Sequence, residues 1–171
     1  MAICTRKTES PAAVEPEQPP IMPMISEITD KAELNFFNAA GVIRLMLSTE
    51  LQGIKVSSIC LTTSGAIGGE CGYIPQSRKI FFDDSMQSSN EVILDCPDGI
   101  VLSKEATAFH IVVPHQTYSD LSIKVTTTDY RQQTFTLKGG KEIVVERSSI
   151  ATIPLKVTSV SEVGQPKINA K

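Results

Sequence analysis

From Leu34 to Val157, apolar residues recur at every second position in short runs that are separated by Gly, Pro, Asn, Asp and Ser. A period of two places the apolar side chains on one face of an extended strand, whereas an amphipathic helix needs a period near 3.6. Short strands with turn residues between them are typical of sandwiches and barrels, and about ten such strands are predicted here. The pattern therefore predicts an all-β fold with a Greek-key β-sandwich of two stacked sheets.

The clearest predicted strand covers residues 121–126, because its apolar residues all fall on one face and its polar residues on the other. A turn at residues 64–67 predicts a hairpin between strands 54–61 and 70–74. A second hairpin is predicted where Pro97-Asp98-Gly99 follows residues 92–96. Further predicted strands cover residues 43–47, 78–82, 100–102, 109–113, 133–138, 143–145 and 150–157.

The ends of the chain differ from its centre in composition. Residues 1–30 are rich in proline and polar residues, which favour an extended, solvated chain, so we expect a flexible, disordered N-terminal linker. Residues 31–158 are expected to form one sandwich domain, and residues 159–171 a flexible C-terminal tail. The only helix-like spacing lies around residues 31–37, which is too short and too poorly capped to predict a helix.

Charge and hydropathy exclude several classes of function. The chain carries a formal net charge of −3, and its basic residues form no cluster that would replace phosphate counterions, so a nucleic-acid-binding role is not expected. It also has no polybasic segment for an anionic membrane and no run near the ~18 apolar residues that a membrane span needs.

The N-terminal sequence has no apolar region typical of a secretory signal. Cys4 resembles the acceptor cysteine of a lipoprotein, but Ile3 stands where a small residue is expected, so we favour an unpaired cysteine in the tail. Two alternatives remain open at this point. Either the chain is exported with its leader missing from this sequence, or it stays inside the cell.

The four cysteines predict no zinc site, because none of them forms a C-x-x-C pair. A hairpin that turned at Gly65-Ala66 would place Cys60 opposite Cys71, at a separation that suits a disulfide. A shift of one residue in the turn would remove that pairing. The bridge between Cys60 and Cys71 is therefore a hypothesis beside the alternative of two small buried thiols.

No catalytic constellation is apparent in the sequence. His110 falls on the outward side of its predicted strand and His115 follows Pro114, and neither is accompanied by a recognisable serine or cysteine nucleophile. Both are expected to be surface histidines. No nucleophile elbow or paired-carboxylate motif is present, so we predict that the protein is not an enzyme.

Metal and cofactor sites are likewise not predicted. Asp83-Asp84 and the pair Asp95 and Asp98 supply oxygen ligands of the kind that calcium prefers, but no D-x-D-x-D-G loop contains them. Gly68-Gly69 is not followed by a helix, so it is expected to mark a bulge and not a phosphate-binding turn.

Five segments, taken in order, resemble the fimbrillin-like pilins and surface lipoproteins of Bacteroidales. They include an aromatic residue and an apolar run that ends in Pro-x-x-Thr, then an I-x-V-x-T-x-D strand and a V-x-R-S-x-I return. The segments are residues 36–47, 92–102, 108–117, 121–129 and 141–154. The resemblance implies a transthyretin-like sandwich displayed on the outer membrane surface or in a fimbrium, with a lipid anchor if a leader is missing. This chain accommodates one such domain, whereas these pilins usually have two.

Two functions follow as hypotheses. The resemblance implies a structural or adhesive module that assembles by strand addition, with other pilus or surface-protein subunits, or host or bacterial surface ligands, as partners. The alternative is a surface lipoprotein module that binds glycans. Sugar sites usually need exposed aromatic rings, and the candidates are Tyr73, Tyr118 and Tyr130.

Overall fold

The computed structural model describes residues 3–5, 23–26, 33–137 and 141–162. In this part of the chain it contains strands and no helix, so the prediction of an all-β fold is confirmed. The sixteen strands are β1 (Ile3–Thr5), β2 (Met24–Ser26), β3 (Phe36–Asn38), β4 (Ala40–Thr49), β5 (Lys55–Thr62), β6 (Gly68–Ile74), β7 (Lys79–Phe81), β8 (Ser88–Ser89), β9 (Glu91–Val101), β10 (Thr107–Pro114), β11 (Gln116–Tyr118), β12 (Ser122–Thr127), β13 (Arg131–Thr136), β14 (Ile143–Val145), β15 (Ile150–Val157) and β16 (Ser161–Glu162).

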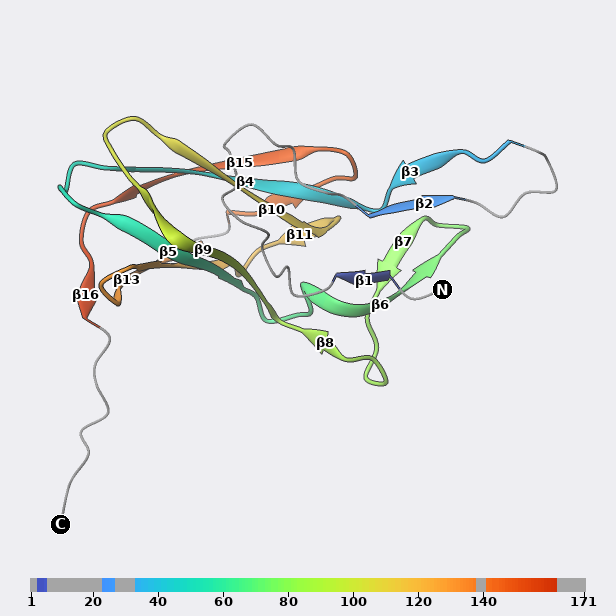
Figure 1. Ribbon diagram of the computed structural model, residues 1–171. Coiled ribbons are helices and arrows are strands. Elements are labelled where there is room, and N and C mark those ends of the chain that lie inside the picture. The colour runs from blue at the N-terminus through green and yellow to red at the C-terminus, as the bar shows by residue number, and fades with distance from the viewer. Residues whose placement is uncertain (1–2, 6–22, 27–32, 138–140, 163–171) are drawn as a thin grey trace, which may run out of the picture.

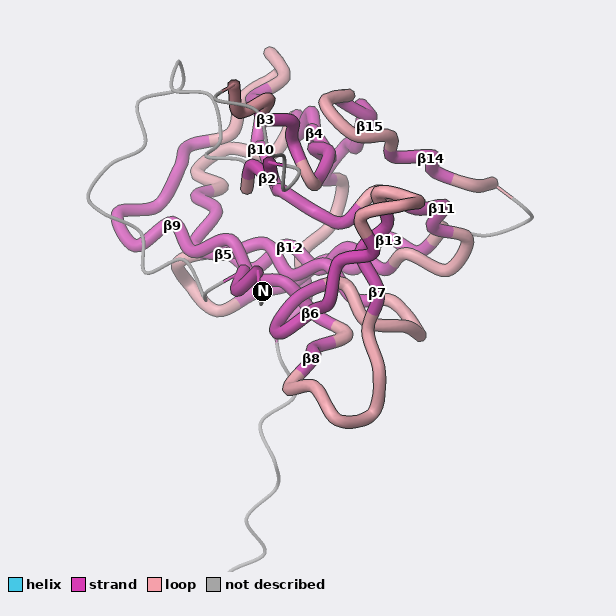
Figure 2. Tube along the Cα trace, turned by 90° about the vertical axis from the view of Figure 1, so that its right-hand side faces the viewer, coloured by secondary structure: helices cyan, strands magenta, loops and turns pink. Residues whose placement is uncertain are grey.

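Two sheets form the body of the molecule. One has the order β10-β4-β15, in which β4 is antiparallel to β10 and parallel to β15. The other has the order β16-β13-β12-β5-β9 and is antiparallel throughout. Figures 1 and 2 show them as two stacked layers. The predicted β-sandwich is therefore observed, while its Greek-key and transthyretin-like details stay a prediction.

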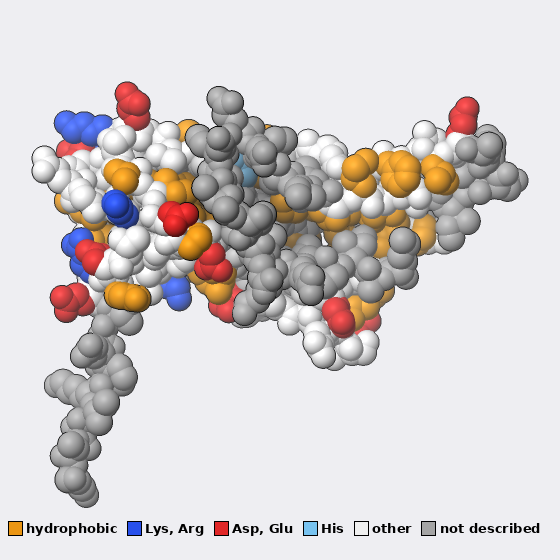
Figure 3. Space-filling view, in the orientation of Figure 1, with side chains coloured by type: hydrophobic (Ala, Val, Ile, Leu, Met, Phe, Trp, Pro, Cys, Tyr) orange, Lys and Arg blue, Asp and Glu red, His pale blue; other side chains and the backbone are white. Residues whose placement is uncertain are grey.

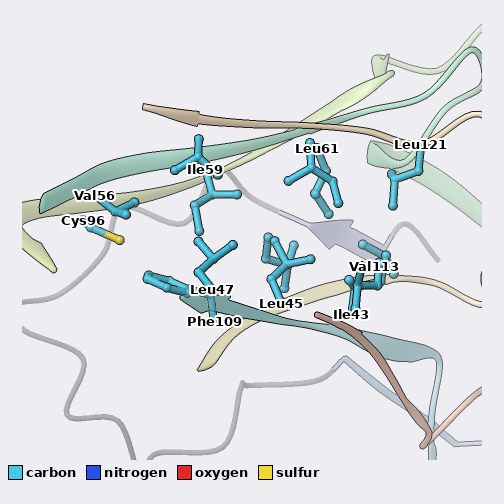
Figure 4. Close-up of a cluster of buried hydrophobic side chains, with 14 of the residues drawn as sticks. Ile43, Leu45, Leu47, Val56, Ile59, Leu61, Cys96, Phe109, Val113 and Leu121 are labelled. Carbon is cyan, nitrogen blue, oxygen red and sulfur yellow. The ribbon is translucent and has the colours of Figure 1, made fainter. Parts of the chain in front are cut away.

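The core lies between these two sheets and follows the period-two pattern of the sequence. Ile43, Leu45 and Leu47 of β4 are fully buried, and they face Ile59 and Leu61 of β5 across the sandwich (Figure 4). Burying side chains of this size stabilises a fold by about 1.5–3 kcal/mol each. The core also contains alternate residues of β10 and β12, namely Phe109, Ile111, Val113, Ile123 and Val125.

Three smaller groups of strands accompany the two sheets of the sandwich. β6 pairs with β1, β7 and β8 in one of them. β11 pairs with β14, and β2 pairs with β3. The β2–β3 ribbon projects from one end of the sandwich (Figure 1).

The predicted hairpin between residues 54–61 and 70–74 is wrong. β5 pairs with β12 on one side and with β9 on the other, so both of its edges are occupied and β6 lies in a different sheet. The turn residues 64–67 therefore connect two sheets. Local turn chemistry predicted the change of direction but not the partner strand, because the partner is set by contacts between residues far apart in the sequence.

The second predicted hairpin, at Pro97-Asp98-Gly99, is also wrong. β9 runs through these residues without reversing, and its register with β5 shifts between the pairs Ser58–Asp95 and Val56–Ile100. Residues 96–99 therefore form a bulge opposite Ser57. Gly99 has φ +70°, which a residue without a Cβ adopts at little cost.

The predicted linker and tail contain short strands where the structure describes them. β1 and β2 lie within residues 1–30, and β16 lies within residues 159–171, and each of the three pairs with another strand. Residues 1–2, 6–22, 27–30 and 163–171 of these two segments lie outside the described residues. Within residues 31–37, β3 begins at Phe36, in agreement with the absence of a predicted helix.

Candidate functional site

The candidate site is the edge of the three-stranded sheet that β10 forms. The hydrogen bonds within this sheet determine which backbone groups of β10 point outward. The amide of Val42 donates to the carbonyl of Ser149 at 3.0 Å, so the even-numbered residues of β4 are bonded to β15. Successive residues of a strand direct their N–H and C=O groups to opposite sides. The odd-numbered residues of β4 are therefore bonded to β10, through the pairs Ile43–Ile111 and Leu45–Phe109.

This register leaves one edge of β10 without a partner strand among the described residues. The N–H and C=O groups of Ala108, His110 and Val112 point away from β4, and no hydrogen bond of these groups to another described residue is present. At the end of the strand, Tyr118 closes the edge, because its hydroxyl donates to the outward carbonyl of Pro114 at 2.8 Å. β10 contains no Lys, Arg, Asp or Glu that would oppose the approach of another strand.

The opposite edge of the same sheet is protected. In β15, the residues bonded to β4 are the odd-numbered ones, so Pro154 and Lys156 lie at outward positions. Proline has no N–H to donate, and lysine at an edge discourages pairing. Lys156 also forms an ion pair with Glu50 at 2.6 Å. β15 is therefore a poor acceptor for a further strand.

One edge of the second sheet, that of β9, is protected as well. The amide of Thr63 donates to the carbonyl of Asn90, so the even-numbered residues of β9 are bonded to β5. Glu91, Ile93 and Asp95 are therefore the outward positions of β9. Two of these three are acidic, and the bulge at residues 96–99 follows directly. Charges and bulges are the features by which natural sheets avoid edge-to-edge pairing. Of these three edges, at β10, β15 and β9, the edge of β10 is the one without an outward charge or a bulge.

The two histidines lie near this edge but form no catalytic arrangement with a described serine or cysteine. His110 lies on the outer face of β10 opposite Arg44, and burial together with the charge of Arg44 lowers its pKa. Burial also lowers the pKa of His115, with Arg147 and Lys79 acting in the same direction and a hydrogen bond to the backbone of Ala39 opposing them. Both histidines are half-buried, so part of each side chain lies at the surface.

The pairing on which the Cys60–Cys71 hypothesis depends is not formed. Cys60 lies opposite Ile93 and Lys124, and Cys71 lies opposite Ile3. Cys60 is a buried free thiol whose sulfur lies 3.7 Å from Oε2 of Glu91. The geometric reason for the bridge is thereby removed, because β5 and β6 do not form a hairpin.

Cys96 is the third buried thiol of the described region. It lies in the bulge of β9, and burial, with the charge of Asp95 as a second cause, raises the pKa of this thiol to about 11. A thiol with a raised pKa is a poor nucleophile. Cys96 therefore belongs to the core, whereas the side chain of Cys4 lies outside the described residues.

The acidic residues form no metal-binding group in the described part of the chain. Asp83 instead organises its own loop, because it accepts a hydrogen bond from the amide of Ser85 at 2.8 Å, and bonds from Ser85 lower its pKa. Asp83 and Asp84 line an open surface hollow of about 460 Å³. Asp95 and Asp98 lie in β9, before and within its bulge.

Gly68 and Gly69 lie within β6, opposite Ser89 and Ser88 in regular register, so the bulge predicted there is not observed. Gly69 has φ +92°, and a Cβ at this position would overlap the backbone of Gln87 and Ser88. The glycine thus permits the close approach of β8.

The three tyrosines are not equally available to a ligand. Tyr118 is 2% exposed and its hydroxyl is bonded to Pro114, so its expected role as an exposed platform is wrong. Tyr73 is half-buried, and its hydroxyl is buried without a described partner. Tyr130 is 80% exposed. The glycan-binding hypothesis stays a prediction, with Tyr130 as its fully exposed tyrosine.

Comparisons with known proteins leave the family open. No protein-family model matches the chain, and a search of curated proteins found no match. The described residues contain no helix that is long and apolar enough to span a bilayer.

Proposed function

We propose that this chain is a non-catalytic structural or adhesive module of the cell surface, which joins other pilus or surface-protein subunits by strand addition at the free edge of β10. The observation that carries the proposal is the row of outward backbone groups at Ala108, His110 and Val112, on a strand without charge or bulge. The resemblance to fimbrillin-like proteins supports the surface location and the class of partner.

The physical basis of the proposed association is main-chain hydrogen bonding. An extended segment of a partner would exchange N–H and C=O bonds with β10 and would extend the sheet by one strand. The rest of the sheet is rigid, because β4 is paired on both sides and its inner face is fully buried. A pre-organised edge loses little conformational entropy on binding, which favours affinity.

Side chains beside the edge would set the register of the added strand. Ala108, His110 and Val112 lie half-buried on the outer face of the sheet, and alternate residues of an added strand would contact them. Because the neutral form of His110 is favoured by its lowered pKa, this row carries no full charge near neutral pH. The added strand is therefore expected to present apolar or small polar residues at these positions.

Replacement of Val112 by proline tests the proposal. The change removes one outward N–H and leaves the bonds between β10 and β4 in place, since those use the odd-numbered residues. In cells that express the tagged chain, we expect the wild-type protein in high-mass surface complexes and Val112→Pro released as free chain, as measured by size-exclusion chromatography.

Thr152→Pro is the matched control, because residue 152 is at an outward position of the already protected β15. We expect this variant to remain in the complexes, and thermal unfolding should show that both proline variants are folded. Recovery of Val112→Pro in the same complexes as the wild type, or a wild-type chain that is free at the surface, would overturn the proposal.

A further inference from the structure

Two chain segments that are far apart in the sequence meet where β3 passes into β4. In the turn between β14 and β15, the hydroxyl of Ser148 accepts a hydrogen bond from the side chain of Asn38 at 3.0 Å. Between β10 and β11, the ring of His115 is hydrogen-bonded to the backbone of Ala39. The β14–β15 turn and His115 are therefore held on adjoining residues of the β3–β4 junction.

Basic side chains converge on this junction. Arg147 precedes the turn serine, and its Nη1 donates to the carbonyl of Arg78, in the turn between β6 and β7, at 2.9 Å. Lys79 is the next residue of that turn. Burial, and then the charges of Arg147 and Lys79, lower the pKa of His115, so both cations lie close to its ring. We call His115, Lys79 and Arg147 the basic cluster.

No acidic side chain of the described residues forms an ion pair with the basic cluster. Elsewhere on the molecule, Lys156 pairs with Glu50 at 2.6 Å, and Figure 3 shows basic and acidic side chains interspersed at the end of the sandwich that carries β16. Glu146 is exposed beside the arginine of the cluster, but it is not among the charges that act on the pKa of the histidine. The positive charge of the cluster is therefore not matched by a neighbouring carboxylate.

The donors of the cluster suit an oxyanion. The Arg147 guanidinium is fixed on the carbonyl of Arg78, and its other N–H groups have no partner among the described residues. A guanidinium presents a planar fork of donors that matches the oxygens of a phosphate. Nδ1 of His115 is buried and likewise has no partner in the described part of the chain, which is rare in a folded protein. A bound oxyanion would favour the protonated ring and would accept a hydrogen bond from it.

We propose that the basic cluster binds a tetrahedral oxyanion, which is a phosphate or a sulfate group. The permanent positive charges of Lys79 and Arg147 match a doubly charged ion better than they match a single carboxylate. Lys79 is exposed, so the site is open on one side to an anion that a larger molecule carries. This site goes beyond strand addition at β10, because it uses side chains and none of the outward backbone groups of that edge.

A proton NMR titration of the histidine signals tests the site, because the chain has 2 histidines and His110 serves as an internal reference. Sodium sulfate is compared with sodium chloride at equal ionic strength, so that general screening is the same in both. We expect the pKa of His115 to be higher in sulfate, since a nearby anion favours the protonated ring, and that of His110 to be equal in the two salts. Equal pKa values of His115 in the two salts would refute the proposal.

Removal of single charges separates binding at the cluster from a general effect of charge. Arg147→Gln should raise the dissociation constant of sulfate about tenfold or more, because it removes a charged hydrogen-bond donor. Lys79→Gln should act in the same direction, and its exposed position keeps the test valid if Arg147→Gln does not fold.

Arg44→Gln is the matched control, because Arg44 is also half-buried and lies opposite His110. Its dissociation constant for sulfate should equal that of the wild type. If Arg44→Gln and the two cluster variants weaken binding equally, the anion responds to net charge or binds elsewhere, and the proposal fails.

Further anions identify the ligand and its source. Acetate should bind several-fold more weakly than sulfate, since it carries a single charge. Acetate that binds as tightly as sulfate would contradict the assignment to a tetrahedral oxyanion. Glycerol phosphate that binds as tightly as inorganic phosphate assigns the site to a phosphate group on a larger molecule, as the open side predicts, whereas exclusion of glycerol phosphate assigns it to the free ion.

Discussion

β3 and β4 are neighbours in the chain, and both are apolar, yet their side chains have opposite fates. Phe36 in β3 is 57% exposed, while Ile43 and Leu45 in β4 are fully buried. β4 is the central strand of its sheet and lies over the second sheet, whereas β3 pairs with β2 alone among the described strands. The comparison teaches that burial follows from the neighbours that an element acquires and not from its own hydropathy.

The first prediction measures this difference directly. Leu45→Ala should lower the free energy of unfolding by about 2–5 kcal/mol, because it leaves a cavity in a rigid core. Phe36→Ala should change it by about 0.5 kcal/mol or less, since the larger side chain is mostly in water. Urea unfolding of the monomeric chain, followed by circular dichroism, gives both values. Equal losses from the two substitutions would show that β3 is part of the core.

The second prediction concerns the junction between the two strands. A Cβ at Gly41 would overlap the backbone oxygen of Glu146 and Cγ1 of Val145, so Gly41→Ala should force a backbone shift that costs about 1–3 kcal/mol. The same urea titration measures the loss. Gly53→Ser is a useful contrast, because nothing lies within 4 Å of a Cβ there and only its φ of +73° opposes the change. A neutral Gly41→Ala would mean that β4 and the β14–β15 turn are less closely packed than described.

The third prediction concerns the closed end of the β10 edge. Tyr118→Phe removes the hydroxyl that donates to Pro114 and leaves a buried carbonyl unsatisfied, which should cost about 1–2 kcal/mol. The loss should appear in the urea midpoint with an unchanged slope. If the stability is unchanged, water has replaced the hydroxyl at the carbonyl of Pro114. The accessible edge of β10 would then extend beyond Val112 to Pro114.

The smallest expected effect lies at an exposed turn. Hydrogen bonds from Arg131 and then Thr127 hold the pKa of Asp129 at about 2, below its ordinary 3.8. A lowered pKa in the folded state stabilises the fold above the ordinary value, and this contribution is lost as the pH falls from about 4 to about 2.

Asp129→Asn should therefore lower the melting temperature slightly at pH 5 and should make much less difference near pH 2, because about half of the wild-type side chains are then protonated and most of the contribution is lost. Thermal unfolding at both values measures this. The effect is small because solvent screens the ion pair. A difference that grows towards pH 2 would contradict the assignment.

Much of the fold could be predicted from the sequence where one face of a strand is buried. The alternation at residues 121–126 and 43–47 predicted β12 and β4 and the side that each buries. The two predicted hairpins failed for one reason. Ser64–Ile67 and Pro97–Gly99 have the residues of turns, but turn residues also connect sheets and form bulges, and only the partner strand distinguishes these cases.

The candidate site divides in the same way. The sequence identified β10 and placed His110 on its outer side, but it did not show that this edge lacks a partner strand. It also grouped Tyr118 with Tyr130 as exposed, although the two differ completely in burial. An absence of charge along residues 107–114 was the available signal for a vulnerable edge, and it has meaning only once the strand is known to lie at an edge.

The sequence by itself determined that this chain forms strands and which side chains of most strands enter a common core, because a period of two is a local property of the backbone. The tertiary structure alone decided which strands pair, which edges stay open and which apolar face remains uncovered. Those outcomes depend on contacts between residues up to about a hundred positions apart, such as β4 with β15, and no local pattern specifies such a contact.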